Sequence, residues 1–471
     1  MVNLIIPYLI WEWEKKSLDL LEGNIFRSLL KLSLPLMGTA FVQMCYSLVD
    51  LMWLGRLSTG AVAAVGTCSF FVWIAQAITL IAHTGLSVGL SQAYGRNDHE
   101  EAQKVMISGF WVNLFFCFLL TFFYLTFRNK IIGYYNLEKE VENLTLIYFT
   151  IVSAGLIFTF LNPSFSAVFL ARGNSITPFS ISIIALLFNL LFDPILIFGF
   201  GPFPHMGIAG AAMATVLAQA IASSLYIFSG IKAKEIFTKV NYFKKIDIKY
   251  FTDHLRLGFP PSIQSTVQAL CGVILTKYIA TYGAVSIAVY SIGSQIESIS
   301  WMTSDGFSAA FAAFFGQNYE AGNFDRIKEG RKASLIIINF VGIFSALLMF
   351  IFPYQLYQLF IPGDVDVILA GVVYLRIMAL SEYFMPVEIG TTGMMNGLGL
   401  TNYPAVNAVV LNLARIPFAL IFMPFLGVSG IWLSMSLSSI LKGAFITIIF
   451  IYLRNVTKGF TINMEKYVSR K

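Results

Sequence analysis

The chain has 471 residues, of which 57% are hydrophobic and only 12% are charged, and its mean hydropathy is +0.75. A soluble domain usually carries about 25% charged residues, so this composition excludes a soluble protein. The net charge of +6 is not a sign of nucleic-acid binding, because the Lys and Arg residues gather between apolar stretches. In that position they set the topology of a membrane protein.

The first 25 residues predict a segment at the membrane interface, with Trp11 and Trp13 at headgroup level, and a disordered segment is the alternative. Pro7 and Glu12 interrupt its apolar run, which argues against a signal peptide. Beyond this segment, apolar stretches recur that are long enough for a helix to cross a bilayer. Breaks at Gly, Pro and charged residues separate twelve predicted spans: 28–54, 61–88, 104–127, 143–170, 176–200, 207–230, 255–280, 285–313, 331–353, 367–395, 402–424 and 428–453.

These spans predict an all-α polytopic membrane protein with twelve transmembrane helices in two six-helix bundles, at residues 26–230 and 255–455. A connector, 231–254, joins the bundles, and residues 456–471 form a tail. The connector and its edge are rich in Lys and Arg, whereas "IPGDVD" and "GFGPFPHMG" have none. The positive-inside rule then places the connector and both termini in the cytoplasm. The predicted location is the plasma membrane.

The two bundles are predicted to be parallel repeats. Matching residues recur at an offset that drifts only from 225 to 220: Pro35/Pro260, Asn189/Asn412 and Gly207/Gly427. Because each bundle has an even number of spans, both enter the membrane in the same direction, and an axis along the membrane normal relates them. Some polar residues of the first bundle are absent from the second, as the pairs Asp50/Leu275, Asp193/Ile416 and Thr215/Met435 show.

Four polar residues in the first bundle are the best candidates for a functional site. Asn189 and Asp193 are four residues apart and share one helix face. Asp50 and Thr215 lie at a similar predicted depth, about 8–12 Å below the outer ends of their helices. A carboxylate in hydrocarbon is costly and usually faces a bundle interior or a cavity. The pair could take up a proton or hold Na+ through hard oxygen ligands.

A structural explanation stays open for each of the two acids. Asp50 could reach the membrane surface or pair with Arg56, and Asp193 could form a local hydrogen bond beside Pro194. The repeat comparison favours a functional role, because the matching positions in the second bundle are apolar.

The chain resembles the MATE (multidrug and toxic compound extrusion) family, in its DinF-like branch. The resemblance runs from "LLEGNIFRSLLKLSLPLM" to about residue 455 and rests on "YSLVDLMWLG", "SQAYGR", "ARGNSITP", "NLLFDP" and "GIAGAAMAT". It implies a cation site formed by Asp50, Asn189, Asp193 and Thr215, with Tyr148 close by and a bend of the first helix at Pro35. The chain departs from the NorM-like branch, which has an acid where Gln268 stands here.

Further polar residues are candidates for a substrate cavity: Gln43, Gln268, Glu297, Asp305 and Glu388. Lys277 and Arg415 could instead neutralise the acids of the second bundle. The four cysteines lie in apolar segments without paired spacing, which predicts packing residues rather than disulfides or metal ligands. No cofactor is expected besides H+ or Na+ as the coupling ion.

The resulting hypothesis is a secondary active antiporter, not an enzyme, that exports amphipathic, often cationic organic compounds in exchange for H+ or Na+. The absence of a Walker A motif excludes direct powering by ATP. The expected partners are a small drug-like substrate and membrane lipid, with no nucleic acid, and the protein is expected to be monomeric. The alternatives are a flippase for lipid-linked precursors or polysaccharides of the same superfamily and, from another class, an ion channel or receptor.

Overall fold

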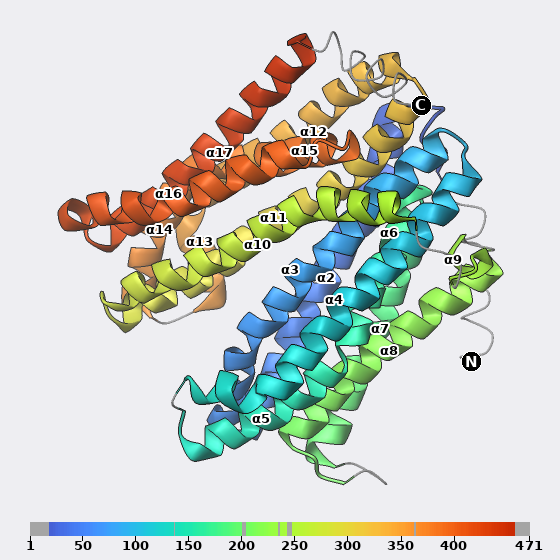
Figure 1. Cartoon of the computed structure of the whole chain (residues 1–471). Helices are drawn as coiled ribbons and strands as arrows, with labels where there is room; N and C mark the ends of the chain where they lie inside the picture. The colour runs from blue at the N-terminus through green and yellow to red at the C-terminus, as the bar shows by residue number, and fades with distance from the viewer. Residues whose placement is uncertain are drawn as a thin grey trace. The chain divides into compact units, whose positions relative to one another are not determined.

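The computed structural model describes residues 18–135, 137–199, 204–233, 236–242, 247–361 and 364–456. Every regular element in this part of the chain is a helix (Figure 1), which confirms the predicted all-α class. Most of the predicted interfacial segment, including Trp11 and Trp13, lies outside the described residues, and so does the predicted tail from residue 457 onward.

The helices of the first half follow the six predicted spans, with one exception. The span 143–170 forms two helices that meet at Gly155 and are bent by 45°. A short helix follows in the connector. These helices are α2 (Ile25–Leu57), α3 (Thr59–Gly95), α4 (His99–Gly133), α5 (Lys139–Ala154), α6 (Leu156–Ala171), α7 (Ile176–Phe198), α8 (Ile208–Lys232) and α9 (Ile236–Lys239).

The second half repeats this arrangement with its own break. The span 367–395 forms two helices, and Tyr383 lies between them. A helix that was not predicted, α13, begins at Pro353, directly after the third span of this half. The helices are α10 (Ile248–Ala280), α11 (Ala284–Glu320), α12 (Phe324–Ile351), α13 (Pro353–Phe360), α14 (Val365–Glu382), α15 (Phe384–Gly397), α16 (Asn402–Leu426) and α17 (Val428–Val456).

The helices of the described residues are consistent with the predicted layout of twelve spans. Among the described residues, nine helical stretches are long and apolar enough to cross a membrane, and the bent pair α5–α6 makes ten. Helices α10 and α11 have 33 and 37 residues, respectively, but carry more polar side chains and do not pass that test. The two-bundle layout of the chain is consistent with these two helices as the remaining spans.

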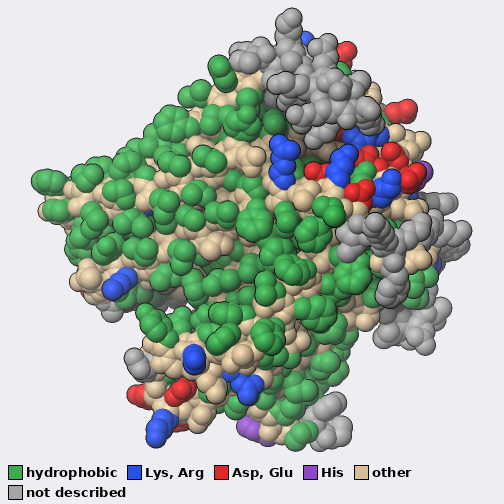
Figure 2. Space-filling view, viewed as in Figure 1, with side chains coloured by type: hydrophobic (Ala, Val, Ile, Leu, Met, Phe, Trp, Pro, Cys, Tyr) green, Lys and Arg blue, Asp and Glu red, His purple; other side chains and the backbone are tan. Residues whose placement is uncertain are grey.

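The outer surfaces of the helices suit contact with lipid tails. Phe118 and Phe122 on α4 and Phe340 and Phe344 on α12 are exposed, and each pair is four residues apart on one helix face. Figure 2 shows hydrophobic side chains over most of the visible face, while charged side chains gather near its margins. Exposed apolar stripes of this extent are costly in water, so the chain is a multi-pass membrane protein.

Local sequence signals explain where helices of the first unit begin, weaken and end. Ser58 caps α3 by accepting a hydrogen bond from the Ala61 backbone N–H at 3.0 Å. In α7, Pro194 has no N–H to donate to the carbonyl group four residues earlier, which weakens the helix beside Asp193. Helix α7 then ends at Gly199, whose φ of +76° is readily adopted only by glycine.

The chain divides into two compact units, each with its own apolar core. One unit contains Lys31–Ser262, and the other contains Leu20–Leu30 and the chain from Ile263 onward. The division therefore falls inside α2 and inside α10, whereas the predicted boundaries lay at 26 and 255. Buried side chains fill each core, such as Phe149, Phe160 and Phe169 in the first unit and Tyr357, Tyr374 and Trp432 in the second.

The N-terminal part of α10, up to Ser262, belongs to the first unit and packs closely within it. His254 is buried, and its ring lies against the helix backbones at Gly85 of α3 and Gly109 of α4. Gly258 approaches the backbone of Ile81 so closely that a methyl group there would lie 2.2 Å from the Ile81 carbonyl oxygen. The absence of a side chain at Gly258 is what allows this approach.

Residues 20–24 belong to the second unit and are held there by hydrogen bonds from Asn318 and Arg326. Asn318 Nδ2 donates to the Leu20 carbonyl oxygen at 3.0 Å. The Arg326 guanidinium donates to the carbonyl oxygens of Leu20, Glu22 and Gly23 at 3.2, 3.0 and 2.9 Å. Part of the predicted interfacial segment is therefore fixed to protein, and Leu20 is fully buried.

Candidate functional site

The candidate site in the first unit begins with Asp50, which lies two turns before the end of α2. Thr215 of α8 donates its hydroxyl to Asp50 Oδ2 at 3.3 Å, and the same hydroxyl reaches the Ala211 carbonyl oxygen at 3.0 Å. Tyr46, one turn before Asp50, donates to the Thr215 carbonyl oxygen at 3.3 Å. These contacts join the end of α2 to α8 around one carboxyl group.

Helix α7 contributes Asn189 and Asp193 to the same place. Both side chains have 0% exposure, and Asn189 Nδ2 donates to Asp193 Oδ1 at 3.1 Å. The Asp50 carboxyl lies beside the Asp193 carboxyl and the Asn189 amide, near enough to interact with both. The structure thus brings Asp50, Asn189, Asp193 and Thr215 together, which the sequence could not establish.

Tyr148 lies close to this group, as the family resemblance implies. It is a buried residue of α5 and interacts electrostatically with both Asp50 and Asp193. Arg56, a predicted partner of Asp50, has its guanidinium 4.8 Å from the ring centroid of Trp53 instead. This position of Arg56 weakens the structural explanation for Asp50.

Three buried oxygen atoms of the site accept no hydrogen bond from any described residue: Asp50 Oδ1, Asp193 Oδ2 and Asn189 Oδ1. A buried acceptor without a partner is costly, and two neighbouring carboxylates also repel each other. A proton on either acid, or a small hard cation between the oxygens, would relieve both costs. The donor set therefore fits H+ or Na+, although no cluster of three or more Cys, His, Asp or Glu occurs among the residues described.

A second polar network extends along α8 from the cation-site candidates. Thr159 of α6 donates to Gln219 Oε1 at 2.8 Å, and Asn162 Nδ2 donates to the Gln219 carbonyl oxygen at 3.1 Å. Ser223 donates to Asn162 Oδ1 at 2.6 Å. The sequence interpretation missed this network and Tyr46. The signal was present, since Thr215, Gln219 and Ser223 recur every four residues and share one face of α8.

Pro35 and the two glutamines of the predicted cavity have the following positions. Pro35 lies inside α2, and Thr39 donates to its carbonyl oxygen at 3.1 Å. Gln43 is exposed and belongs to the first unit, and Gln268 is half-buried and belongs to the second. Their predicted roles as a bend and as cavity-lining groups stay predictions.

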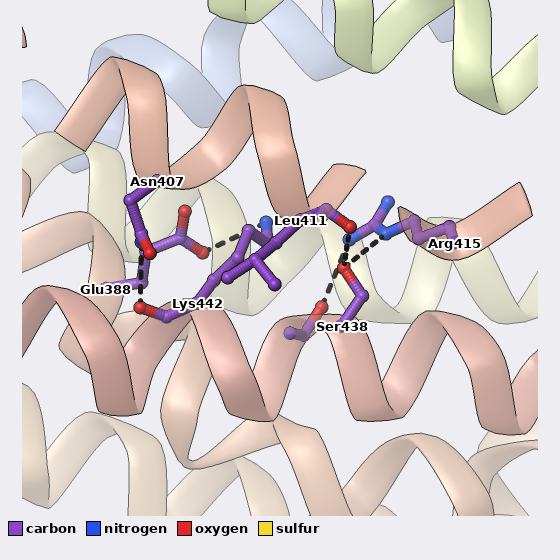
Figure 3. Close-up of polar contacts among 7 residues, drawn as sticks. Glu388, Asn407, Leu411, Arg415, Ser438 and Lys442 are labelled. Carbon is purple, nitrogen blue, oxygen red and sulfur yellow. Dashed lines mark hydrogen bonds and ion pairs between the residues drawn. The ribbon is translucent and has the colours of Figure 1, made fainter. Parts of the chain in front are cut away.

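The predicted cavity acids of the second unit differ from one another in their surroundings. Glu297 of α11 accepts a hydrogen bond from the Tyr374 hydroxyl at 2.5 Å. Asp305 is exposed on the same helix. Glu388 of α15 is buried and forms an ion pair with Lys442 of α17 at 3.0 Å (Figure 3). The sequence interpretation did not single out Lys442, although a lysine in the middle of an apolar span was a clear signal.

The predicted cationic partners in the second unit do not form short ion pairs with these acids. Lys277 is exposed near the end of α10. Arg415 of α16 donates instead to two serine hydroxyls of α17, Ser438 and Ser439. Cys68, Cys117 and Cys271 are buried and, like the more exposed Cys45, are free thiols.

A duplicated all-helical membrane fold with a buried carboxyl pair in one repeat defines a membrane transporter. The MatE family model matches the chain twice, at residues 35–195 and 260–421, which together make up more than half of its length. The chain therefore belongs to the MATE family, a family of transporters rather than enzymes. The two matches begin at Pro35 and Pro260, one of the pairs from which the repeat was predicted.

Known relatives cover nearly the whole chain. A Thermotoga maritima protein named "Probable multidrug resistance protein NorM" is 27% identical over 88% of this chain and 89% of its own length. A Shewanella oneidensis protein named "FAD transporter" is 23% identical over 90% of this chain and 94% of its own. A crystal structure of a MATE protein in complex with MaL6 has a TM-score of 0.86 at 20% identity, covering 94% of this chain and 99% of that one, and shows that the fold is shared.

Proposed function

We propose that the chain is a secondary active antiporter that exports amphipathic, often cationic organic compounds in exchange for H+ or Na+. The observation that carries this proposal is the pairing of Asp50 with Asp193 in a buried group with three oxygen atoms that no described residue satisfies. The name of the Thermotoga maritima relative, a multidrug resistance protein, supports the direction of transport and a broad substrate range.

The coupling follows from the cost of burying two carboxylates side by side. Binding of H+ or Na+ removes the repulsion between Asp50 and Asp193 and draws α2, α7 and α8 together around one site. Loss of the ion leaves the repulsion and favours an arrangement in which the carboxyl groups are separated or hydrated. An ion that binds one conformation better than the other shifts the population between them. By resemblance, Pro35 permits the bend of α2 that this shift requires.

Export requires the ion and the substrate to favour different conformations of the same protein. Binding of either one then lowers the affinity for the other by the same factor, and an inward ion gradient drives outward release of the substrate. The proposal includes a plasma-membrane location with cytoplasmic termini, surrounding lipid as the main partner and a monomeric transporter.

The test is export of a fluorescent organic cation by the purified protein in liposomes, with a pH gradient and a Na+ gradient imposed separately. Asp193→Asn removes the charge and keeps the size of the side chain. We expect this variant to lose at least about tenfold in the rate driven by the coupling ion, as expected for loss of a charged group in the coupling site. Undiminished export by Asp193→Asn under both gradients would refute the assignment of the site.

The repeat supplies a matched control for this experiment. Asn189 and Asn412 occupy equivalent positions in α7 and α16, and both have 0% exposure. Asn189→Ala should uncouple transport from the ion gradient, whereas Asn412→Ala should leave the coupling intact. Equal effects of the two variants would mean that the asparagine acts only as scaffold, in which case the coupling site would not include Asn189.

A further inference from the structure

Arg415 of α16 is a cation inside the second bundle, and no carboxylate of the described residues forms an ion pair with it. Its Nε donates to Ser438 Oγ and its Nη2 donates to Ser439 Oγ, each at 3.1 Å. The Ser438 hydroxyl in turn donates to the Leu411 carbonyl oxygen at 2.7 Å, so it can only accept from Arg415 (Figure 3). One edge of the guanidinium is therefore fixed to α17 by neutral groups.

The other edge of the guanidinium is available. No described residue accepts a hydrogen bond from Nη1, and Figure 3 shows one guanidinium nitrogen directed away from α17. Arg415 is half-buried, whereas Lys442, the neighbouring cation, is 6% exposed and paired with Glu388. Arg415 is thus the more accessible of the two cations, and no described carboxylate pairs with it at short range.

The nearby acids Glu297 and Glu388 do not accept hydrogen bonds from the free edge of the Arg415 guanidinium. Glu297 and Glu388 influence Arg415 electrostatically, but each already has a short contact. Glu297 accepts from the Tyr374 hydroxyl, and Glu388 pairs with Lys442. They lower the cost of the guanidinium in the membrane without covering its free edge.

The scaffold does not require an arginine at this position. With the offset of the Asn189/Asn412 pair, the counterpart of Arg415 in the first bundle is Phe192, which stacks on Phe188 at a centroid distance of 4.0 Å. The first bundle thus packs with an aromatic ring where the second carries a positive charge. A guanidinium held along one edge presents its remaining donors in a fixed direction, a geometry that suits a carboxylate or a phosphate.

We propose that the free edge of Arg415 binds an acidic group, a carboxylate or a phosphate ester, of the transported compound. This inference rests on the proposed function and narrows its substrate class, because it adds zwitterionic and anionic amphipaths to the organic cations. The Asp50–Asp193 site remains the proposed binding site of the coupling ion, and Arg415 binds the acidic group of the substrate.

Two dyes that differ only in one acidic group test the inference. Rhodamine 19 carries a free carboxylate, and rhodamine 6G is its ethyl ester, so the aromatic cation is the same in both. Fluorescence anisotropy with the purified full chain in neutral detergent measures the affinity of each dye. We expect Arg415→Gln to weaken the binding of rhodamine 19 by about tenfold, as for loss of one charge-assisted pair, and to change the affinity for rhodamine 6G by less than about twofold.

Two further variants separate recognition from a loss of folding. Arg415→Lys keeps the charge but loses the fork, so it should restore part of the affinity for rhodamine 19. Arg376→Gln removes an exposed arginine on α14 and should change neither dye. Equal losses for both dyes in Arg415→Gln, or no loss for either, would overturn the inference.

The source of the acidic group and the proposed function are tested separately. The affinity of rhodamine 19 is measured with and without short-chain phosphatidylglycerol, for wild type and for Arg415→Gln. If the lipid displaces the dye only from wild type, and both proteins bind the dye equally without lipid, then Arg415 binds a lipid headgroup. In that case the inference about the substrate is wrong. Transport of the same dyes in liposomes tests the antiporter itself. Selective dye binding without gradient-driven export would refute the proposed function while supporting the role of Arg415.

Discussion

The Glu388–Lys442 ion pair gives the sharpest test of how the second bundle is held together. The pair joins α15 to α17 at 3.0 Å, and both side chains are 8% exposed. Asn407 of α16 donates to the Lys442 carbonyl oxygen at 3.0 Å, so three helices meet at this point. The perturbation is Glu388→Met, Lys442→Met and the double variant, because methionine keeps most of the volume without the charge.

The expected magnitudes follow from the burial of both groups. Removal of one partner leaves an uncompensated charge, which costs about 3–5 kcal/mol of unfolding free energy. Removal of both leaves an apolar pair, and the free energy should return to within about 1 kcal/mol of wild type. The first bundle already shows that apolar packing is possible here, since the counterparts of Glu388 and Lys442 are Phe165 and Ala222, both buried.

The two single variants should differ from each other. After Lys442→Met, Glu388 still has Arg415 as a neighbouring cation, because the two residues interact electrostatically. After Glu388→Met, Lys442 loses its anion and keeps the like charge of Arg415 nearby. We therefore expect Glu388→Met to cost more than Lys442→Met.

The measurement is reversible unfolding of the purified protein in mixed micelles with increasing dodecyl sulfate, followed by circular dichroism. A double-mutant cycle gives the coupling energy between the two positions. A coupling below about 1 kcal/mol, or a double variant as unstable as the sum of the single variants, would refute the view that the pair is a mutually compensated buried unit.

Further predictions concern two segments next to the points where the chain passes from one unit to the other, the start of α10 and residues 20–24. Gly258→Ala should destabilise the protein by about 1–3 kcal/mol, because its methyl group would lie 2.2 Å from the Ile81 carbonyl oxygen. Gly272→Ala on the same helix has open space and should be neutral or stabilising by up to about 1 kcal/mol. Thermal unfolding compares the two, and equal melting temperatures would contradict the packing argument. Arg326→Ala should expose residues 20–24 to hydrogen exchange and limited proteolysis, because three carbonyl contacts are lost, whereas unchanged protection would show that Asn318 suffices.

The positions of the membrane helices could be predicted because apolar length is a local property of the sequence. The breaks were harder. Gly155 lies between α5 and α6, and Tyr383 lies between α14 and α15. Each lies within a stretch that is long and apolar enough for one span, so each pair was predicted as one span. Tyr383 keeps helical backbone angles, and a local signal lies three residues later, because Pro386 has no N–H to donate to the Glu382 carbonyl oxygen.

The candidate site was predictable in its members but not in its geometry. Asp50 and Asp193 are conspicuous in apolar helices, but whether they face each other depends on how α2 and α7 rotate, which no local pattern determines. Lys442 was as conspicuous and was missed, since its partner Glu388 is 54 residues away and the ion pair is visible only in three dimensions. Tyr46 and Gln219 could have been found from the sequence, because each lies four residues from a recognised polar residue and therefore on the same helix face.

The two repeats show how one scaffold can carry a pair of acids in one half and an ion pair in the other. Asn189 and Asn412 are both fully buried, but Asn189 donates to Asp193, whereas neither polar atom of the Asn412 amide has a described hydrogen-bond partner. The partner is missing because Ile416 stands where Asp193 does in the first repeat. An unsatisfied buried amide costs about 1–3 kcal/mol, so Asn412 is not explained by the stability of the second repeat. We interpret it as the remainder of a duplicated polar site whose acid is present only in the first repeat. This asymmetry agrees with the proposal that the coupling ion binds in the first repeat, while the second repeat carries Arg415.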